Sequence, residues 1–178
     1  MREQTLSALS HVAGQRTQIV EVPLLHYVNI RGRIEDGVIG AMGGSLGISL
    51  PVKPNTVADN SIIRAYWLGP DEWLLVSVGR DAHEMAEAAL RSLAGLHGAV
   101  TDVSSGHTML KLNGGGAADV LAKGCGLDLH PRVFGPGQCA QSLIAKCPVL
   151  IERPEEFRII VRRSYADYLW QWLVDATR

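Results

Sequence analysis

Short stretches of the chain alternate apolar and polar residues with a period of two, which is the pattern of half-buried β-strands. Residues 27–33 are the clearest example. A Gly-Pro-Asp-Glu sequence at 69–72 separates two further strand-like stretches and has the composition of a tight hairpin turn. The predicted strands are residues 27–33, 62–68 and 73–78 in the first half of the chain, and 107–112, 138–145, 149–152 and 157–161 in the second half.

Segments with helical spacing of apolar residues lie between and after these strands. The predicted helices are residues 81–94, 117–123 and 164–176, with a weaker, glycine-rich helical pattern at 37–48. Asp81 and Glu84 have the spacing of a capping box, and Ser164 and Asp167 repeat that spacing at the start of the last helix. Residues 51–60 contain two prolines and two asparagines, so we expect a loop there.

The two halves of the chain also share local sequence. Asp-Glu-Trp-Leu-Leu-Val at 71–76 matches Glu-Glu-Phe-Arg-Ile-Ile at 155–160, and Gly-Ile-Ser-Leu-Pro at 47–51 matches Leu-Asp-Leu-His-Pro at 127–131. Matching segments in the same order of elements indicate an internal duplication.

The duplication predicts an α+β fold built from two strand–helix–strand–strand–helix units. We expect mostly antiparallel sheets with helices on one side, and not a Rossmann fold. One compact domain would then contain a first repeat at 17–97 and a second repeat at 98–178, preceded by a mobile N-terminal arm at 1–16.

The composition is that of an ordinary globular protein without a strong charge. The chain has 178 residues, 17 Lys and Arg against 18 Asp and Glu, 47% hydrophobic residues and a formal net charge of −1. Nucleic acids and anionic membrane surfaces attract basic proteins, so neither is an expected partner. No secretory signal is visible at the start, and the apolar runs are far shorter than the roughly 20 residues that cross a bilayer. We therefore expect a cytoplasmic protein.

Two motifs could carry chemistry, and each has a simpler structural explanation. The glycines at 114–116 lie between a strand and a helix, where backbone N–H groups can bind an anion, but no dinucleotide or P-loop fingerprint accompanies them. Asp102, Ser104, Ser105 and His107 include the residue types of a catalytic triad, but they lie too close in sequence to form one readily. We expect a turn in which the side chains of Asp102 and Ser104 bond to nearby backbone.

Metal and disulfide chemistry have no supporting pattern either. The six histidines form no His-x-His or HExxH pair, and no two cysteines have zinc-ligand spacing. The chain has an odd number of cysteines, Cys125, Cys139 and Cys147, and no CxxC pair. This pattern suits buried free thiols in a reducing compartment. We therefore expect no catalytic, cofactor-binding or metal-binding residue in this chain.

The last predicted helix has more aromatic surface than one core face needs. Successive helical residues turn by about 100°, which places Trp170 and Trp172 about 200° apart, so both cannot face the same core. Trp and Tyr are frequent anchors of protein interfaces, and we predict a partner interface at Tyr168, Trp170 and Trp172. The alternative is a helix sandwiched inside one domain.

Five longer segments together resemble one protein family. They are 68–75 (Leu-Gly-Pro-Asp-Glu-Trp-Leu-Leu), 102–107 (Asp-Val-Ser-Ser-Gly-His), 121–131 (Leu-Ala-Lys-Gly-Cys-Gly-Leu-Asp-Leu-His-Pro), 134–140 (Phe-Gly-Pro-Gly-Gln-Cys-Ala) and 163–170 (Arg-Ser-Tyr-Ala-Asp-Tyr-Leu-Trp). On these residues the chain resembles the gamma subunits of heterotetrameric sarcosine oxidase. Their wider relatives are the aminomethyltransferase-like proteins, including the glycine-cleavage T-protein, whose folate-binding domain has a similar duplicated α+β fold.

The resemblance implies a non-catalytic structural subunit of an oxidoreductase complex. Sarcosine oxidases of this kind demethylate sarcosine to glycine in sarcosine catabolism and one-carbon metabolism, with formation of hydrogen peroxide and 5,10-methylenetetrahydrofolate. The resemblance places FAD, FMN, NAD and tetrahydrofolate on the alpha and beta subunits and zinc on delta, and none of them on this chain alone. The alpha subunit would be the main partner of the chain, with beta and delta completing the heterotetramer.

Two other functions stay open from the sequence. The first is a stand-alone folate-binding protein of the same fold, which Lys123-Gly-Cys125 suggests. The Gly-Leu-Asp-Leu-His sequence that follows departs from the Gly-Gln of that group's signature. The second is a small independent enzyme or ligand-binding protein with a pocket between the repeats.

Overall fold

The chain forms two structural units, and the first is inserted into the second. The computed structural model describes residues 12–13, 17–34 and 37–178. Residues 25–104 form one unit, here called the inserted unit. The described residues before 25, together with residues 105–178, form the other, here called the terminal unit.

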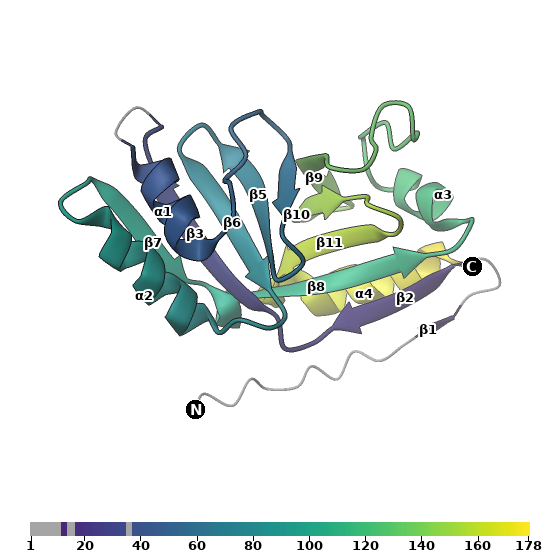
Figure 1. Ribbon diagram of the computed structural model, residues 1–178. Helices are drawn as coiled ribbons and strands as arrows, with labels where there is room; N and C mark the ends of the chain where they lie inside the picture. Colours follow the sequence, from purple (N-terminus) through teal and green to yellow (C-terminus); the bar gives the residue numbers. More distant parts are fainter. Residues whose placement is uncertain (1–11, 14–16, 35–36) are drawn as a thin grey trace. The chain divides into compact units, whose positions relative to one another are not determined.

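The inserted unit is a five-stranded antiparallel sheet with two helices on one face (Figure 1). The strand order is β4-β5-β6-β3-β7. Its elements are β3 (His26–Gly32), α1 (Val38–Leu46), β4 (Val57–Asp59), β5 (Ile63–Gly69), β6 (Glu72–Ser77), α2 (Ala82–Leu93) and β7 (Gly98–Asp102). Alternate residues of β3 and β6, such as Val28, Ile30 and Trp73, pack against Met42 of α1 and Met85 of α2. The period-two pattern of the strands therefore meets the apolar stripes of the two helices.

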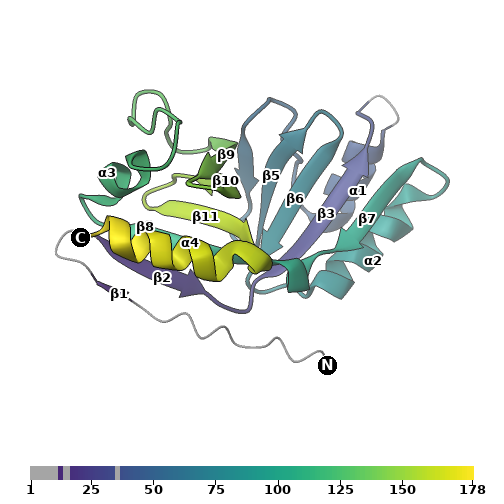
Figure 2. The ribbon, with the colours of Figure 1, turned by 180° about the vertical axis from the view of Figure 1, so that it is seen from behind.

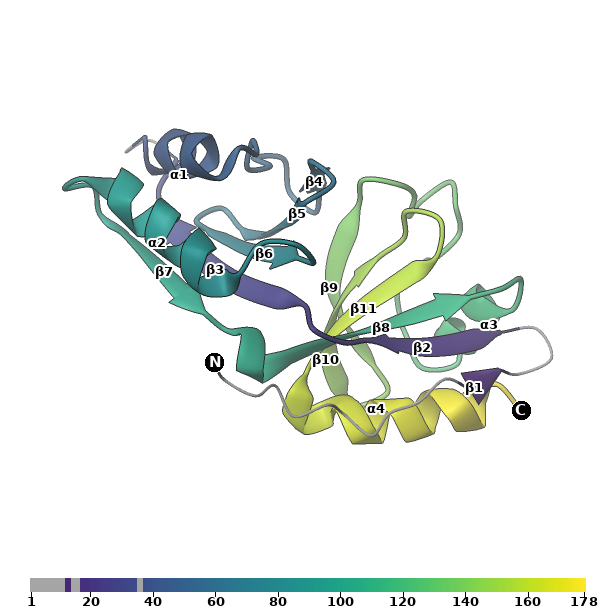
Figure 3. The same ribbon diagram turned by 60° about the horizontal axis from the view of Figure 1, so that its bottom comes forward.

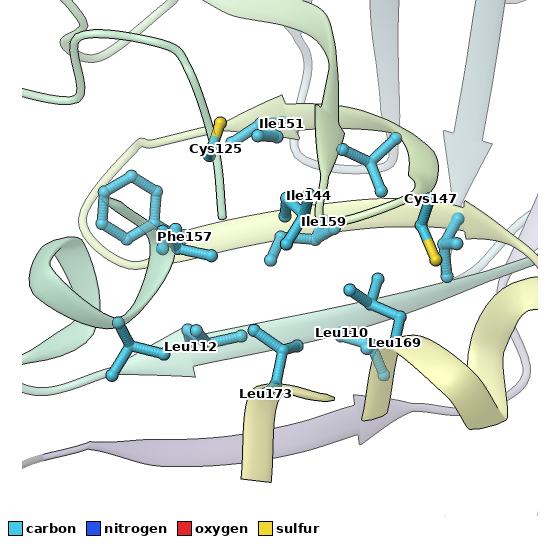
Figure 4. Packing of buried hydrophobic residues seen from close by; sticks show 14 of the residues in the cluster. Leu110, Leu112, Cys125, Ile144, Cys147, Ile151, Phe157, Ile159, Leu169 and Leu173 are labelled. Carbon is cyan, nitrogen blue, oxygen red and sulfur yellow. The ribbon is translucent and has the colours of Figure 1, made fainter. Parts of the chain in front are cut away.

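The terminal unit is a six-stranded antiparallel sheet in the order β1-β2-β8-β11-β10-β9. Its elements are β1 (Val12–Ala13), β2 (Gln18–Val22), β8 (His107–Asn113), α3 (Ala117–Ala122), β9 (Cys139–Ile144), β10 (Cys147–Glu152), β11 (Phe157–Arg162) and α4 (Arg163–Ala176). The long helix α4 lies along one face of this sheet (Figures 2 and 3). Leu169 and Leu173 of α4 point at Leu110 and its neighbours on the strands (Figure 4).

The two sheets confirm the α+β fold with antiparallel strands, and they share one strand order. β7-β3-β6-β5-β4 in the inserted unit corresponds to β2-β8-β11-β10-β9 in the terminal unit. The first strand of each predicted repeat does not pair with the rest of that repeat but joins the sheet of the other unit. Thus β2 pairs with β8, and β7 pairs with β3.

This exchange of strands moves the boundaries that the sequence predicted. The expected repeats were 17–97 and 98–178, whereas β2 at 18–22 belongs with the terminal unit and β7 at 98–102 with the inserted unit. A strand shows its own period in the sequence but not its partner, and pairing decides the unit. The predicted arm at 1–16 lies largely outside the described residues, apart from β1.

Local predictions were confirmed where a side chain marks the element. The Asp81 carboxylate accepts a hydrogen bond from the backbone N–H of His83 at 2.8 Å and so caps α2. The predicted cap at Ser164 was wrong, because β11 runs directly into α4 and the helix begins at Arg163 without a side-chain cap. The loop predicted at 51–60 contains the short strand β4, whose three residues pair with β5. The other residues of this range form a loop, as predicted.

Candidate partner interface

Helix α4 contains the aromatic residues for which an interface was predicted. Its buried residues recur at positions 166, 169, 170 and 173, which is the spacing of one helical face. Trp170 is 8% exposed and belongs to the same apolar cluster as Leu169 and Leu173. The structure therefore places Trp170 in the core of the terminal unit.

Trp172 lies on the opposite flank of the helix and packs over Gly124. A Cβ atom at Gly124 would lie 2.5 Å from Cζ2 of the Trp172 ring, so only glycine leaves room for the indole there. The backbone N–H of Ala145 donates to the Gly124 carbonyl at 2.8 Å and holds this segment in place. Both indoles therefore find packing partners within the unit, as in the alternative of a sandwiched helix.

The exposed aromatic surface of α4 consists of tyrosines. Tyr165 is 41% exposed and Tyr168 is 45% exposed, and residues three apart are neighbours on a helix surface. With the half-buried Trp172, they form a row at positions i, i+3 and i+7, here called the aromatic row. Tyr165 was missed from the sequence, although its spacing to Tyr168 was the available signal.

The Asp102–Ser104 segment forms the turn that was predicted from its residue types. The backbone N–H of Ser104 donates to the Asp102 carboxylate at 2.9 Å. The Ser104 hydroxyl accepts from the N–H of Tyr27 at 3.0 Å and donates to the Tyr27 carbonyl at 3.3 Å. The hydroxyl thus joins this turn to β3 and has a structural role.

The glycines at 114–116 form a tight connection from β8 to α3. The N–H of Ala117 donates to the carbonyl of Gly114 at 3.1 Å, and Gly114 has a φ of 102°, a conformation that favours glycine. The helix that follows has six residues. These features account for the glycines without an anion.

A buried polar pair joins β2 to β8 and was not foreseen from the sequence. The Thr108 hydroxyl donates to the Glu21 carboxylate at 2.6 Å, and Thr108 and Glu21 are 2% and 9% exposed. Glu21 lies on the same side of β2 as the buried Ile19, which was the available signal. The bond satisfies a carboxylate that would otherwise be buried at high cost.

The comparisons with known proteins identify the family. A sequence profile of the sarcosine oxidase gamma subunit family matches residues 31–178. The gamma subunit of sarcosine oxidase from Corynebacterium sp. strain U-96 is 34% identical over 171 residues, which are 94% of this chain and 82% of that protein. The gamma subunit from Corynebacterium sp. strain P-1 is 33% identical and covers 89% of this chain and 79% of that protein. The chain belongs to the sarcosine oxidase gamma subunit family.

Solved structures agree with this assignment. A chain of the heterotetrameric sarcosine oxidase from Corynebacterium sp. U-96, solved with pyrrole 2-carboxylate, superposes with a TM-score of 0.87 at 33% identity. The match covers 94% of this gamma-family chain and 87% of that chain. The aminomethyltransferase T of the glycine cleavage system from Bartonella henselae matches with a TM-score of 0.64 at 16% identity, over 89% of this chain and 45% of that chain. The second likeness confirms the T-protein-like fold.

The described part of this gamma-family chain has no group of three or more His, Cys, Asp and Glu side chains arranged to hold a metal ion. Among the same residues, no helix is both long and apolar enough to cross a membrane. Cys125, Cys139 and Cys147 are all buried free thiols, in agreement with their interpretation as small buried side chains.

Burial raises the pKa of the Cys147 thiol, because removal from water disfavours the thiolate. The thiolate is the reactive form, so we expect iodoacetamide to modify Cys147 in the native chain on the order of 100-fold more slowly than in the denatured chain. Mass spectrometry of the modified peptide measures the two rates. Equal rates would contradict a protected thiol.

The same shift gives a pH dependence with a definite sign. The folded state holds the Cys147 proton more tightly than the unfolded state, so its contribution to stability is complete below the ordinary thiol pKa. That contribution declines as the pH rises through the raised value.

Proposed function

We propose that this chain is the gamma subunit of a heterotetrameric sarcosine oxidase and that it serves assembly instead of catalysis. The observation that carries the proposal is the match to a chain of such an enzyme over 94% of the sequence, with a TM-score of 0.87. The triad-like motif supports the assembly role, because the hydroxyl of its Ser104 is engaged with the backbone of β3. In this proposal the complex oxidatively demethylates sarcosine.

The alpha subunit is the partner that we propose for direct contact, with beta and delta completing the complex. FAD, FMN, NAD, tetrahydrofolate and zinc then lie on these other subunits. The stand-alone folate-binding alternative is not favoured, since the family match covers most of the chain.

Purification of the tagged chain from its own cells tests the proposal. We expect three partner subunits to co-purify with the chain. The purified complex should show the visible absorption of bound flavin and produce hydrogen peroxide when sarcosine is added. A chain that elutes alone, without flavin, from cells induced on sarcosine would contradict the proposal.

We propose the aromatic row of α4 as part of the contact with the partner. Tyr165 and Tyr168 are large side chains that are 41% and 45% exposed. Each has only two rotatable side-chain bonds, so its ordering at an interface costs little conformational entropy. The proposed interface therefore stays on α4, as predicted, with Tyr168 at the centre of the aromatic row and Trp172 at one end of it.

The variant Tyr168→Ala is expected to weaken association with the rest of the complex by about 10- to 30-fold, as an aromatic anchor does. Its effect on the melting temperature of the free chain should be small, because the side chain is 45% exposed. Surface-immobilised chain titrated with the remaining subunits measures the affinity. The matched control is Leu90→Ala on α2, an apolar side chain that is 49% exposed in the inserted unit. Equal affinities for wild type, Tyr168→Ala and Tyr165→Ala would remove this face from the interface.

A further inference from the structure

Strand β7 is a sheet edge to which no further described residue is bridged. It has five residues and lies at one end of the five-stranded sheet (Figure 1). The opposite edge, β4, has only three residues. In the six-stranded sheet, the edge strand β1 has two residues, and the edge strand β9 has six residues, of which one, Ile144, is bridged to Cys125. Proteins commonly shorten or cover their edge strands, whereas β7 is longer than β4 and β1 and, unlike β9, has no bridge to a further described residue.

The hydrogen bonds of β3 show which backbone groups of β7 point outward. The N–H of Gly32 donates to the backbone carbonyl of Asp71 on the β6 side. The carbonyl of Tyr27 accepts from the backbone N–H of Val103 on the β7 side. Backbone direction alternates along a strand, so the odd-numbered residues of β3 bond to β7. Their partners in register are Ala99 and Thr101. The backbone N–H and C=O groups of Gly98, Val100 and Asp102 therefore point away from the sheet.

The side chains of β7 leave this edge accessible. Ala99 and Thr101 are exposed, and the Val100 side chain packs against the apolar core of the inserted unit. The strand contains neither lysine nor proline, the residues that commonly block pairing at an edge. No described strand lies beside the outward groups of β7.

The internal repeat indicates what belongs at this edge. β7 occupies the position in its sheet that β2 occupies in the other, and the outer edge of β2 is covered by β1. The pairing is antiparallel, with Val12 opposite Ile19 and Ala13 opposite Gln18. The equivalent place beside β7 is unfilled by the described part of the chain.

We propose that β7 is completed by an extended segment of a partner subunit, which adds as an antiparallel strand. Its backbone would bond to the outward groups of Val100 and Asp102, and small or β-branched residues would suit the exposed Ala99 and Thr101. This mode of binding joins main chains and needs few specific side chains. The inference rests on the proposed function, because the partner is another subunit of the same enzyme.

Amide hydrogen exchange at single-residue resolution tests the added strand without any variant. In the assembled enzyme, the amides of Val100 and Asp102 should exchange on the order of 100-fold more slowly than in the free chain, while Ala99 and Thr101 stay protected in both. Equal exchange of Val100 and Asp102 in a complex that has co-purified would overturn the added strand and leave the proposed function intact. If no subunit co-purifies, both proposals fail. Protection that grows with the concentration of the free chain would identify a second copy as the occupant and overturn the proposal too.

A matched pair of variants separates the backbone from the side chain. Val100→Pro removes an outward N–H at an edge position that tolerates proline, whereas Val100→Ala keeps the N–H and loses similar packing. We expect at least a tenfold loss of affinity for the other subunits with Val100→Pro relative to Val100→Ala. Equal affinities of the two variants would contradict a main-chain contact. If Val100→Pro does not fold, the exchange measurement on the wild type decides.

Discussion

Replacing Trp73 by alanine is expected to lower the free energy of unfolding of the inserted unit by about 4 kcal/mol. The side chain is fully buried between the sheet and the two helices. Its indole N–H also donates to the Pro51 carbonyl at 2.7 Å, which ties the loop before β4 to the sheet. Truncation leaves a cavity and an unpaired carbonyl together, and both effects destabilise the native state. Urea unfolding of the free chain, followed by far-ultraviolet circular dichroism, measures the change.

The variant Trp73→Phe separates the two effects. It keeps most of the buried apolar volume and removes the hydrogen bond, so we expect a loss of about 1–2 kcal/mol. A loss below about 1 kcal/mol for Trp73→Ala would show that the site relaxes around the cavity, in conflict with the close packing of this core.

The repeat partner of Trp73 shows what the sequence predicts and what it cannot. The match of 71–76 with 155–160 aligns Trp73 with Phe157, and the structure buries both side chains, with Phe157 3% exposed. A phenyl ring has no N–H, so the terminal unit holds its corresponding loop differently. There the Arg153 guanidinium donates to the Leu129 carbonyl at 2.8 Å and lies 4.9 Å from the Phe157 ring centroid. Periodicity predicts burial, while the choice of hydrogen-bond partner depends on the three-dimensional packing.

The exchange of β2 and β7 was beyond the reach of the sequence for a related reason. A short strand such as Gly98–Asp102 has too few residues for a clear alternation, and its exposed pattern resembles a loop. Its assignment to β3 depends on contacts with residues 66 to 74 positions earlier in the chain (98 minus 32, and 102 minus 28). Such long-range pairing is decided by tertiary structure, which no local window contains.

The candidate interface shows the same division between local geometry and packing. The angle of about 200° between Trp170 and Trp172 was sound helical geometry, and the conclusion that one ring needs an outside partner did not follow from it. Residue 124 lacks a Cβ atom, so the chain beyond α3 approaches α4 closely enough to cover the second ring. From the sequence, nothing connects Gly124 with a residue 48 positions later (172 minus 124).

Trp170→Ala is therefore expected to act on stability before association. The ring is 8% exposed within the apolar cluster of the terminal unit, and its truncation should cost about 3–4 kcal/mol in the free energy of unfolding. Chain that remains folded keeps the exposed tyrosines of α4, so its affinity for the other subunits should stay within about threefold of wild type. Tyr168→Ala should show the opposite pattern, with near-native stability and weakened association. Denaturant unfolding and titration with the remaining subunits, performed on both variants, distinguish a core residue from an interface residue. If Trp170→Ala kept its unfolding midpoint and lost affinity, the ring would belong to the interface.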